Sequence, residues 1–163
     1  MAESEVPAGQ AADGFGKVLW VPAIANPAAP TVAELEAGTV VDITYSLVGD
    51  GFRHDITENE ITVNRYTLKQ QLGLPGTRAD SLELQYVTGS PADEELTQGL
   101  SGFIVQRLGV ANEADFAAAQ KVDVIPVTTG IQRKVAPATN TELQKVQRMY
   151  VRGSVRDDVA IAA

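Results

Sequence analysis

Histidine is the first residue type to weigh for chemistry, because the chain has only one, His54, which stands beside Asp55 in a polar segment. A Ser/His/Asp arrangement needs a histidine as general base, so any such site would have to use His54. A two-histidine zinc site is impossible within one chain, and the absence of cysteine rules out thiolate ligands, disulfides and thiol chemistry. We therefore interpret His54 as a solvated loop residue and not as a catalytic group.

Two acidic clusters are the next candidates. Residues 93–95 (DEE) follow Ser90 and Pro91, and residues 157–158 (DD) follow Arg156. Serine caps a helix, proline suits its first position, and acids favour the positive end of the helix dipole, so we prefer a helix start at 90 to a metal or acid/base site. For residues 157–158 we prefer a turn or an intersubunit ion pair to a cation site.

Two short glycine-containing fragments also need an interpretation, GFG at residues 14–16 and GDG at 49–51. Neither continues into a GxGxxG motif, since position 19 is Leu and position 54 is His, and no Walker-type lysine follows. We interpret both as turns. The sequence thus predicts no catalytic, cofactor-binding or metal-binding residue, and we do not expect the chain to be an enzyme.

Basic residues are concentrated in one place, a set of three arginines spaced four residues apart: Arg148, Arg152 and Arg156. Thirteen basic residues stand against twenty-one acidic ones, a net charge of −8, whereas a protein that holds nucleic acid needs the opposite balance. We expect these arginines to pair with acids of a neighbouring subunit; nucleic-acid contact and simple solvation are the alternatives. Trp20 is expected to be a core anchor and not a binding platform.

The length of 163 residues suffices for one ordinary core, and 44% apolar with 21% charged residues is typical of a soluble globular protein. No apolar run approaches the roughly 20 residues of a spanning helix, and the acidic N-terminus lacks the features of a signal peptide. We expect residues 1–16 to be a flexible N-terminal arm and residues 17–163 to form a single β domain that has no contact with a membrane.

The elements that must position these residues are mostly strands. The alternation of apolar and polar residues predicts strands at 17–21, 39–48, 61–68, 81–88, 103–108 and 122–127, the last broken at Pro126. Within 39–48, residues 41, 43, 45 and 47 are expected on one face, and a β-bulge is expected near Asn64. Loops are predicted at 49–60 and 73–76, a helix at 90 that ends at Gly99 or Gly102, and a short helical region at 112–119.

Residues 147–156 are ambiguous, because the arginine spacing suits a helical stripe while Gly153 and the valines favour a strand with the arginines and Tyr150 on one face. We choose the strand. The predicted fold is mostly β, a β-sandwich or barrel of about eight strands with one flanking helix and extended terminal arms.

Five segments, taken in their order and spacing, resemble the major tail (tail tube) proteins of long-tailed phages of actinobacteria. They are KVLWVPAI (17–24), PAAPTVAELEAG (27–38), SPADEELTQG (90–99), KVDVIPVTTGIQ (121–132) and GSVRDDVAIAA (153–163). The resemblance spans residues 17–163 and rests on the set, since no single segment is diagnostic.

The resemblance implies a structural virion protein made in the host cytoplasm. Hexameric rings would stack through an N-terminal arm and a long loop, here residues 49–60, into a tube that conducts phage DNA without binding it specifically. The expected partners are other copies of the chain and the tape measure, terminator and distal tail proteins. The alternatives are another virion component of similar fold, namely a tail terminator, head–tail joining or decoration protein, or a β-barrel binding or enzymatic domain.

Overall fold

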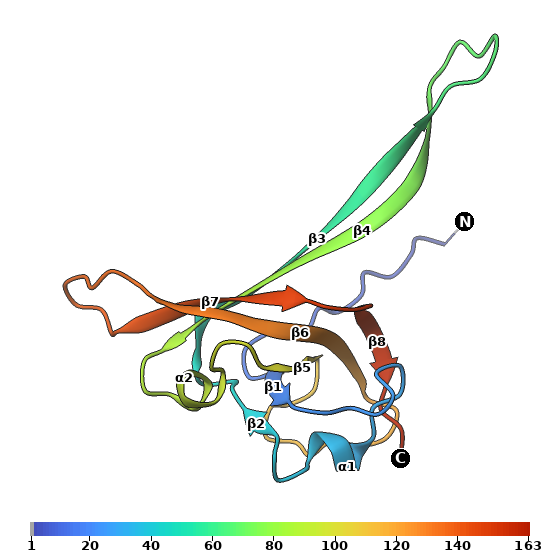
Figure 1. Cartoon of the computed structure of the whole chain (residues 1–163). Coiled ribbons are helices and arrows are strands. Elements are labelled where there is room, and N and C mark those ends of the chain that lie inside the picture. The colour runs from blue at the N-terminus through green and yellow to red at the C-terminus, as the bar shows by residue number, and fades with distance from the viewer. Residues whose placement is uncertain (1) are drawn as a thin grey trace. The chain divides into compact units, whose positions relative to one another are not determined.

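The computed structural model describes residues 2–163, which contain eight strands and two short helices (Figure 1). The mostly-β fold expected from the sequence is confirmed, with one helix more than predicted. The residues form two compact units, each described by itself below. Unit 1 comprises the residues up to Tyr45 together with Gly102–Ile125 and Arg156–Ala163, and unit 2 comprises Ser46–Ser101 and Pro126–Val155.

Unit 1 is built on the sheet order β2-β1-β5-β6, with β8 also paired to β6. The predicted strands at 17–21 and 103–108 are confirmed, and they pair antiparallel from Gly16↔Leu108 to Val21↔Phe103. Trp20 is 4% exposed, so its predicted place in the core is confirmed. The elements are β1 (Gly16–Val21), α1 (Val32–Leu35), β2 (Val41–Asp42), β5 (Ser101–Leu108), the first part of β6 (Lys121–Lys134) and β8 (Arg156–Ala160).

Helix α1 was not predicted, although its signature is present in the sequence. Thr31 is the N-cap and Glu34 lies three residues later, which is the spacing of a capping box. The Glu34 carboxylate accepts hydrogen bonds from the N–H groups of Ala25 and Thr31 at 2.8 and 2.9 Å. The turn so fixed buries Leu35 in the core of unit 1.

The predicted strand at 39–48 is confirmed only at Val41–Asp42 and from Leu47, where β3 begins. Its expected apolar face does not exist, since Ile43 is buried while Tyr45 is 84% exposed. The Asp42 carboxylate accepts the N–H of Thr44 at 2.9 Å, and the Thr44 hydroxyl accepts the N–H of Val18 at 3.0 Å. This Asx-type turn satisfies the backbone locally and ends the strand.

The helical region predicted at 112–119 is also wrong; these residues form turns without helix. The fully buried Arg107 explains the difference. Its guanidinium donates to the main-chain oxygens of Ala111, Ala114 and Asp115 at 3.1, 2.8 and 3.3 Å, and to the Gln120 side chain at 3.1 Å. In a helix these carbonyl oxygens would point along the helix axis and accept main-chain N–H groups. Here they point at the Arg107 guanidinium, so the segment does not form a helix.

Unit 2 has the strand order β6-β7-β4-β3. The predicted strand at 81–88 is confirmed, and Leu82, Leu84 and Tyr86 alternate into the core. The buried Gln147 accepts from the Tyr86 hydroxyl at 3.0 Å and donates to the Leu96 oxygen at 2.8 Å. The elements are β3 (Leu47–Val63), β4 (Leu72–Val87), α2 (Pro91–Glu95), the later part of β6 and β7 (Gln144–Val151).

Helix α2 confirms the predicted start, because the Ser90 side chain accepts the N–H of Asp93 and proline occupies the first turn. It ends at Glu95, earlier than the predicted Gly99 or Gly102. The Leu96 carbonyl is already used by the side chains of Gln132 and Gln147, so further helical turns would have to compete for this acceptor.

Strand β6 continues through Pro126, where the sequence predicted a break. Before Pro126 the strand pairs with β8, as in Val124↔Arg156, and after it with β7, as in Val127↔Val151. The proline thus stands where the strand changes partners from β8 to β7, a position at which a missing N–H is tolerated. The strand predicted at 147–156 is confirmed up to Val151; β8 then begins at Arg156.

Candidate functional site: the β3–β4 hairpin

The predicted loops at 49–60 and 73–76 are wrong, because β3 and β4 form one long antiparallel hairpin that turns at residues 64–71 (Figure 1). The predicted strand at 61–68 is confirmed only up to Val63. The register is irregular between Leu47 and Phe52 and between Glu58 and Glu60, and not near Asn64. Most side chains of this hairpin are exposed, so it carries no one-sided apolar pattern from which a strand could be recognised.

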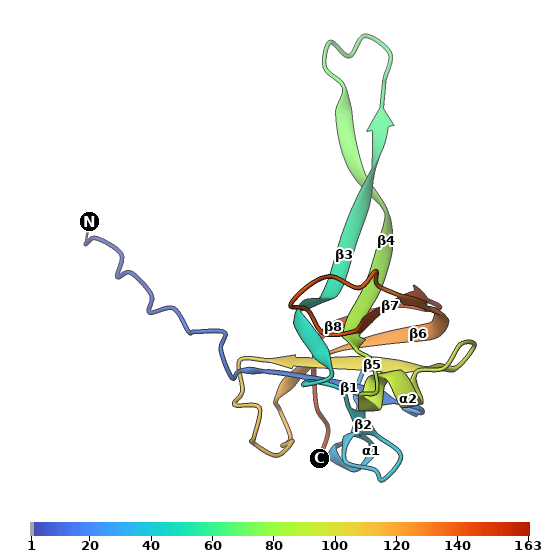
Figure 2. The same ribbon diagram turned by 90° about the vertical axis from the view of Figure 1, so that its left-hand side faces the viewer.

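Only the first part of the hairpin belongs to the sheet of unit 2. Strand β4 pairs with β7 from Leu82 to Val87, whereas its pairing with β3 continues as far as Val63↔Leu72. We call residues 55–81 the free hairpin, since their ladder partners lie within the hairpin itself (Figure 2). Ten residues of β4 extend in this way, roughly 30 Å at about 3.3 Å per residue.

Polar side chains tie the two strands together. Asp80 on β4 lies 3.1 Å from a ring nitrogen of His54 on β3, whose side chain is 11% exposed, and it also accepts from Arg78 of its own strand at 3.0 Å. Asn59 donates to Thr77 at 2.9 Å. His54 is thus not the solvated loop residue that the sequence predicted, but a strand residue whose ring is held by the opposite strand.

Apolar side chains are exposed along the same ribbon. Ile56, Ile61, Leu72 and Leu74 are each about half exposed. Ile61 and Leu74 are directly opposite each other in the ladder. A two-stranded ribbon is marginally stable in water, and clustered exposed apolar groups mark interaction surfaces. The free hairpin therefore has the character of a surface that another protein completes.

The turn, residues 64–71 (NRYTLKQQ), which we call the tip, differs in charge from the rest of the chain. It carries Arg65 and Lys69 and no acid, in a chain of net charge −8. Tyr66 is 97% exposed and Leu68 is 43% exposed. Aromatic and basic side chains of this kind are the usual anchors of protein interfaces.

The acidic clusters have structural partners. Asp93 accepts from the Gly89 N–H at 2.8 Å and pairs with Lys145 at 2.5 Å; burial opposes the charged carboxylate, but these two partners keep the pKa of Asp93 below its ordinary value. The Asp158 N–H donates to the Asp123 carboxylate at 2.8 Å. Among residues 2–163 no group of three or more histidine, cysteine or acidic residues could hold a metal.

The three arginines separate in the structure. Arg148 lies on the exposed face of β7 with its guanidinium 5.3 Å from the centre of the Tyr150 ring, and Arg152 donates to the Val127 oxygen at 3.2 Å. Within the part of the chain that is described, no ion pair joins Arg148 or Arg156 to a carboxylate. Their pairing with a neighbouring subunit stays a prediction. None of the helices in the described range is long and apolar enough to cross a membrane.

Comparison with known proteins identifies the family. A search of curated proteins found no match. A solved structure, the cryo-EM structure of the anti-feeding prophage (AFP) baseplate, 6-fold symmetrised, shares the fold with a TM-score of 0.58 and 13% identity, over 94% of this chain and 96% of that chain. Residues 4–163 match the family described as phage tail tube protein. The chain therefore belongs to the phage tail tube protein family, a structural component of the virion tail.

Proposed function

We propose that the chain is the repeating subunit of a tail tube, in which hexameric rings stack and conduct phage DNA. Membership of the tail tube family supports the structural role. The number six rests on the family resemblance and on the fold shared with a baseplate whose structure is 6-fold symmetrised. The tape measure, terminator and distal tail proteins remain proposed partners, and the absence of enzymatic activity stays a prediction.

The observation that carries the proposal is the free hairpin. It extends beyond its own sheet, and its apolar residues, Ile61 and Leu74 among them, stay half exposed in the isolated chain. Burial of apolar surface contributes about 25 cal/mol per Å², so a neighbouring subunit that covers the hairpin would stabilise both the ribbon and the assembly. We infer that the hairpin makes the contacts between successive rings, with the N-terminal arm, residues 1–16, contributing.

The charge of the chain supports passage of DNA without arrest. Each phosphate held by a free lysine or arginine adds salt-dependent affinity, and a ring-by-ring repeat of such contacts would stop the genome. A surplus of eight acids permits a repulsive channel wall. We propose that the wall is net negative and that Arg148, Arg152 and Arg156 are mostly paired in the assembly; the charge facing the axis in a structure of the assembled tube tests this.

The decisive experiment shortens the hairpin. Residues 56–80 are replaced by Asn-Gly, which closes the pair Asp55↔Ser81 with a two-residue turn and leaves the pairing of β4 with β7 intact. We expect a folded subunit by circular dichroism that forms no tubes in negative-stain microscopy, while the wild type forms tubes. Normal tubes from the shortened variant would contradict the proposal. Wild-type rings that never stack would favour a terminator or head–tail joining protein.

A further inference from the structure

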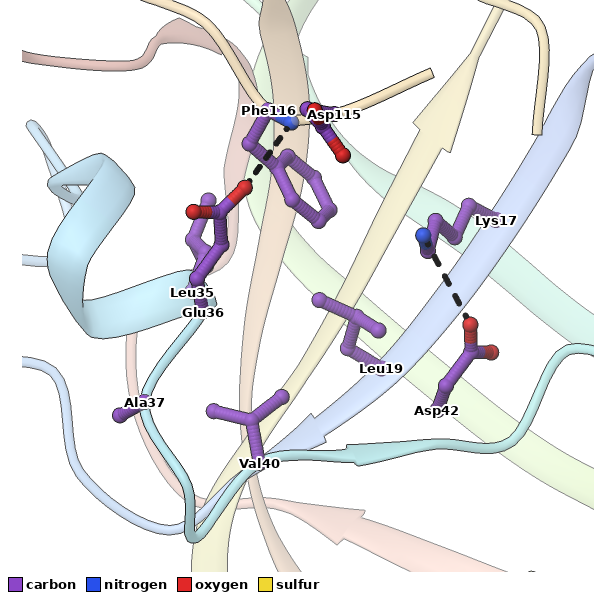
Figure 3. A pocket seen from close by; sticks show the side chains of 9 residues that line it. All are labelled: Lys17, Leu19, Leu35, Glu36, Ala37, Val40, Asp42, Asp115 and Phe116. Atoms are coloured by element: carbon purple, nitrogen blue, oxygen red, sulfur yellow. Dashed lines mark hydrogen bonds and ion pairs between the residues drawn. The ribbon is translucent and has the colours of Figure 1, made fainter. Parts of the chain in front are cut away.

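A pocket of about 330 Å³ lies on unit 1, between β1, α1, β2 and the loop after β5 (Figure 3). Apolar side chains form part of its lining, and three carboxylates and one ammonium group complete it. The lining residues are Lys17, Leu19, Leu35, Glu36, Ala37, Val40, Asp42, Asp115 and Phe116. We call this the acidic pocket, because its formal charge is −2, three negative groups less one positive.

The three carboxylates of the acidic pocket differ in their hydrogen-bond and ion-pair partners. Asp42 lies 3.7 Å from the Lys17 ammonium, and Glu36 accepts the N–H of Phe116 at 3.2 Å (Figure 3). The Asp115 carboxylate has no hydrogen bond or ion pair within the described residues. It stands beside the Phe116 ring in Figure 3; burial lowers the pKa of the nearby Arg107, and the charge of Asp115 opposes this shift. A cation that enters the pocket would therefore meet this carboxylate beside the ring.

The aromatic part of the pocket is held in place before any partner arrives. The guanidinium of buried Arg107 lies 4.5 Å from the centre of the Phe116 ring, and the Lys17 ammonium lies 5.4 Å from it. Such cation–π contacts, together with the main-chain bonds that Arg107 makes to the loop, fix the ring and Asp115. A preformed site loses less conformational entropy on binding.

The charges of the other pockets help to identify the occupant. A second pocket, where β6 ends and β7 begins, is lined by Lys134 and Lys145 and by no acid, so it offers no partner to a basic group. A third, on the free hairpin, has Glu58 and Glu60 but only Leu74 and Pro75 as large apolar lining residues. Of these three pockets the acidic pocket has the most carboxylates and is the one with an aromatic ring, so it is the best match among them for a basic, aromatic ligand.

The tip of the hairpin is such a ligand. We propose that the tip of one copy docks in the acidic pocket of a second copy, with Tyr66 and Leu68 against the apolar lining and the cations Arg65 and Lys69 beside Asp115. This inference rests on the proposed function and names the surface that receives the hairpin. Opposite charges steer the encounter and fix its register, while the apolar anchors supply affinity.

Docking of a tip in the acidic pocket of another copy also explains how an assembly of this chain can keep adding subunits. Tip and acidic pocket are different surfaces of the same chain, so each bound copy still offers a tip and a pocket to the next. Such head-to-tail contacts continue into filaments when they do not close, whereas a self-complementary contact would stop at a dimer.

Charge reversal tests the docking. Arg65→Glu with Lys69→Glu on the exposed tip should raise the protein concentration needed for tube formation by about tenfold or more, measured by light scattering and microscopy. Adding Asp115→Lys and Glu36→Gln, which keeps an acceptor for the Phe116 N–H, should restore assembly. The matched control Glu94→Gln with Glu95→Gln, two exposed acids on α2 outside the hairpin and the acidic pocket, should assemble like the wild type.

The outcomes separate the two proposals. Wild type without tubes contradicts the proposed function. Tubes that form normally after reversal of the tip contradict docking by the tip. Loss of assembly that the pocket changes do not restore, or that the control on α2 reproduces, shows that the effect does not depend on the acidic pocket and overturns its assignment. Circular dichroism of each variant establishes that the subunit is folded.

Disulfide crosslinking between introduced cysteines detects the docking without requiring tubes. The chain has no cysteine of its own, so every crosslink comes from the introduced pair. Leu68→Cys with Ala37→Cys, one in the tip and one in the acidic pocket, should give under oxidation a ladder of covalent multimers. Leu68→Cys with Pro137→Cys, in the pocket with two lysines, should not. A disulfide that forms only within one copy, or equal ladders from both pairs, would refute docking between copies.

Discussion

Arg107 holds the loop that carries two residues of the acidic pocket, so its removal should loosen that loop. Arg107→Met keeps an unbranched aliphatic side chain but removes hydrogen bonds to four acceptors, three of them main-chain oxygens of the loop. A hydrogen bond to a charged group contributes about 1.5–3 kcal/mol. Loss of the guanidinium also removes the cost of burying a charge, which has lowered the pKa of Arg107.

Four lost bonds less the recovered burial cost give an expected loss of about 3 kcal/mol in the free energy of unfolding. The measurement is urea unfolding followed by circular dichroism, in the hairpin-shortened background so that assembly does not contribute. Arg133→Met is the matched control, because Arg133 is exposed and makes a surface ion pair with Glu83 at 3.2 Å; it should cost less than about 0.5 kcal/mol. A loss below about 0.5 kcal/mol for Arg107→Met would refute the role of Arg107.

Two further predictions concern single groups. The N–H groups of Ala25 and Thr31 lower the pKa of Glu34 from 4.5, so the carboxylate stabilises the fold above that value and this effect is lost as the pH falls through the lower folded pKa. In urea unfolding, Glu34→Gln should therefore cost about 1 kcal/mol at pH 7 and much less near pH 3. An equal cost at both pH values would contradict this. Burial raises the pKa of Tyr86 from 10.0 to about 12, so stability should fall as the pH rises from 10 towards 12. Tyr86→Phe should remove the part of this loss of stability that Tyr86 causes. In a pH titration followed by phenolate absorbance, the variant should show one tyrosine fewer with a raised pKa; an unchanged titration curve would contradict this prediction.

Local sequence determined the elements in which one face is buried or a cap is complete. The alternation of Leu82, Leu84 and Tyr86 predicted a strand because these side chains all enter one core. Ser90 and Pro91 predicted the start of α2 because a cap acts over one turn of chain. The capping box of Thr31 and Glu34 was equally local, so α1 was predictable from the sequence although it was not predicted.

Tertiary structure decided the rest. The free hairpin could not be predicted from periodicity, since both of its faces are exposed and its strands are specified by their pairing, as in Ile61↔Leu74. Residues 112–119 have a helical composition, yet Arg107 takes the carbonyl oxygens of Ala114 and Asp115. Arg107 is close in sequence, but its guanidinium is directed at these oxygens because the folded core buries its side chain. The acidic pocket joins β1, α1, β2 and a loop far along the chain, so its charge and shape exist only after the chain has folded.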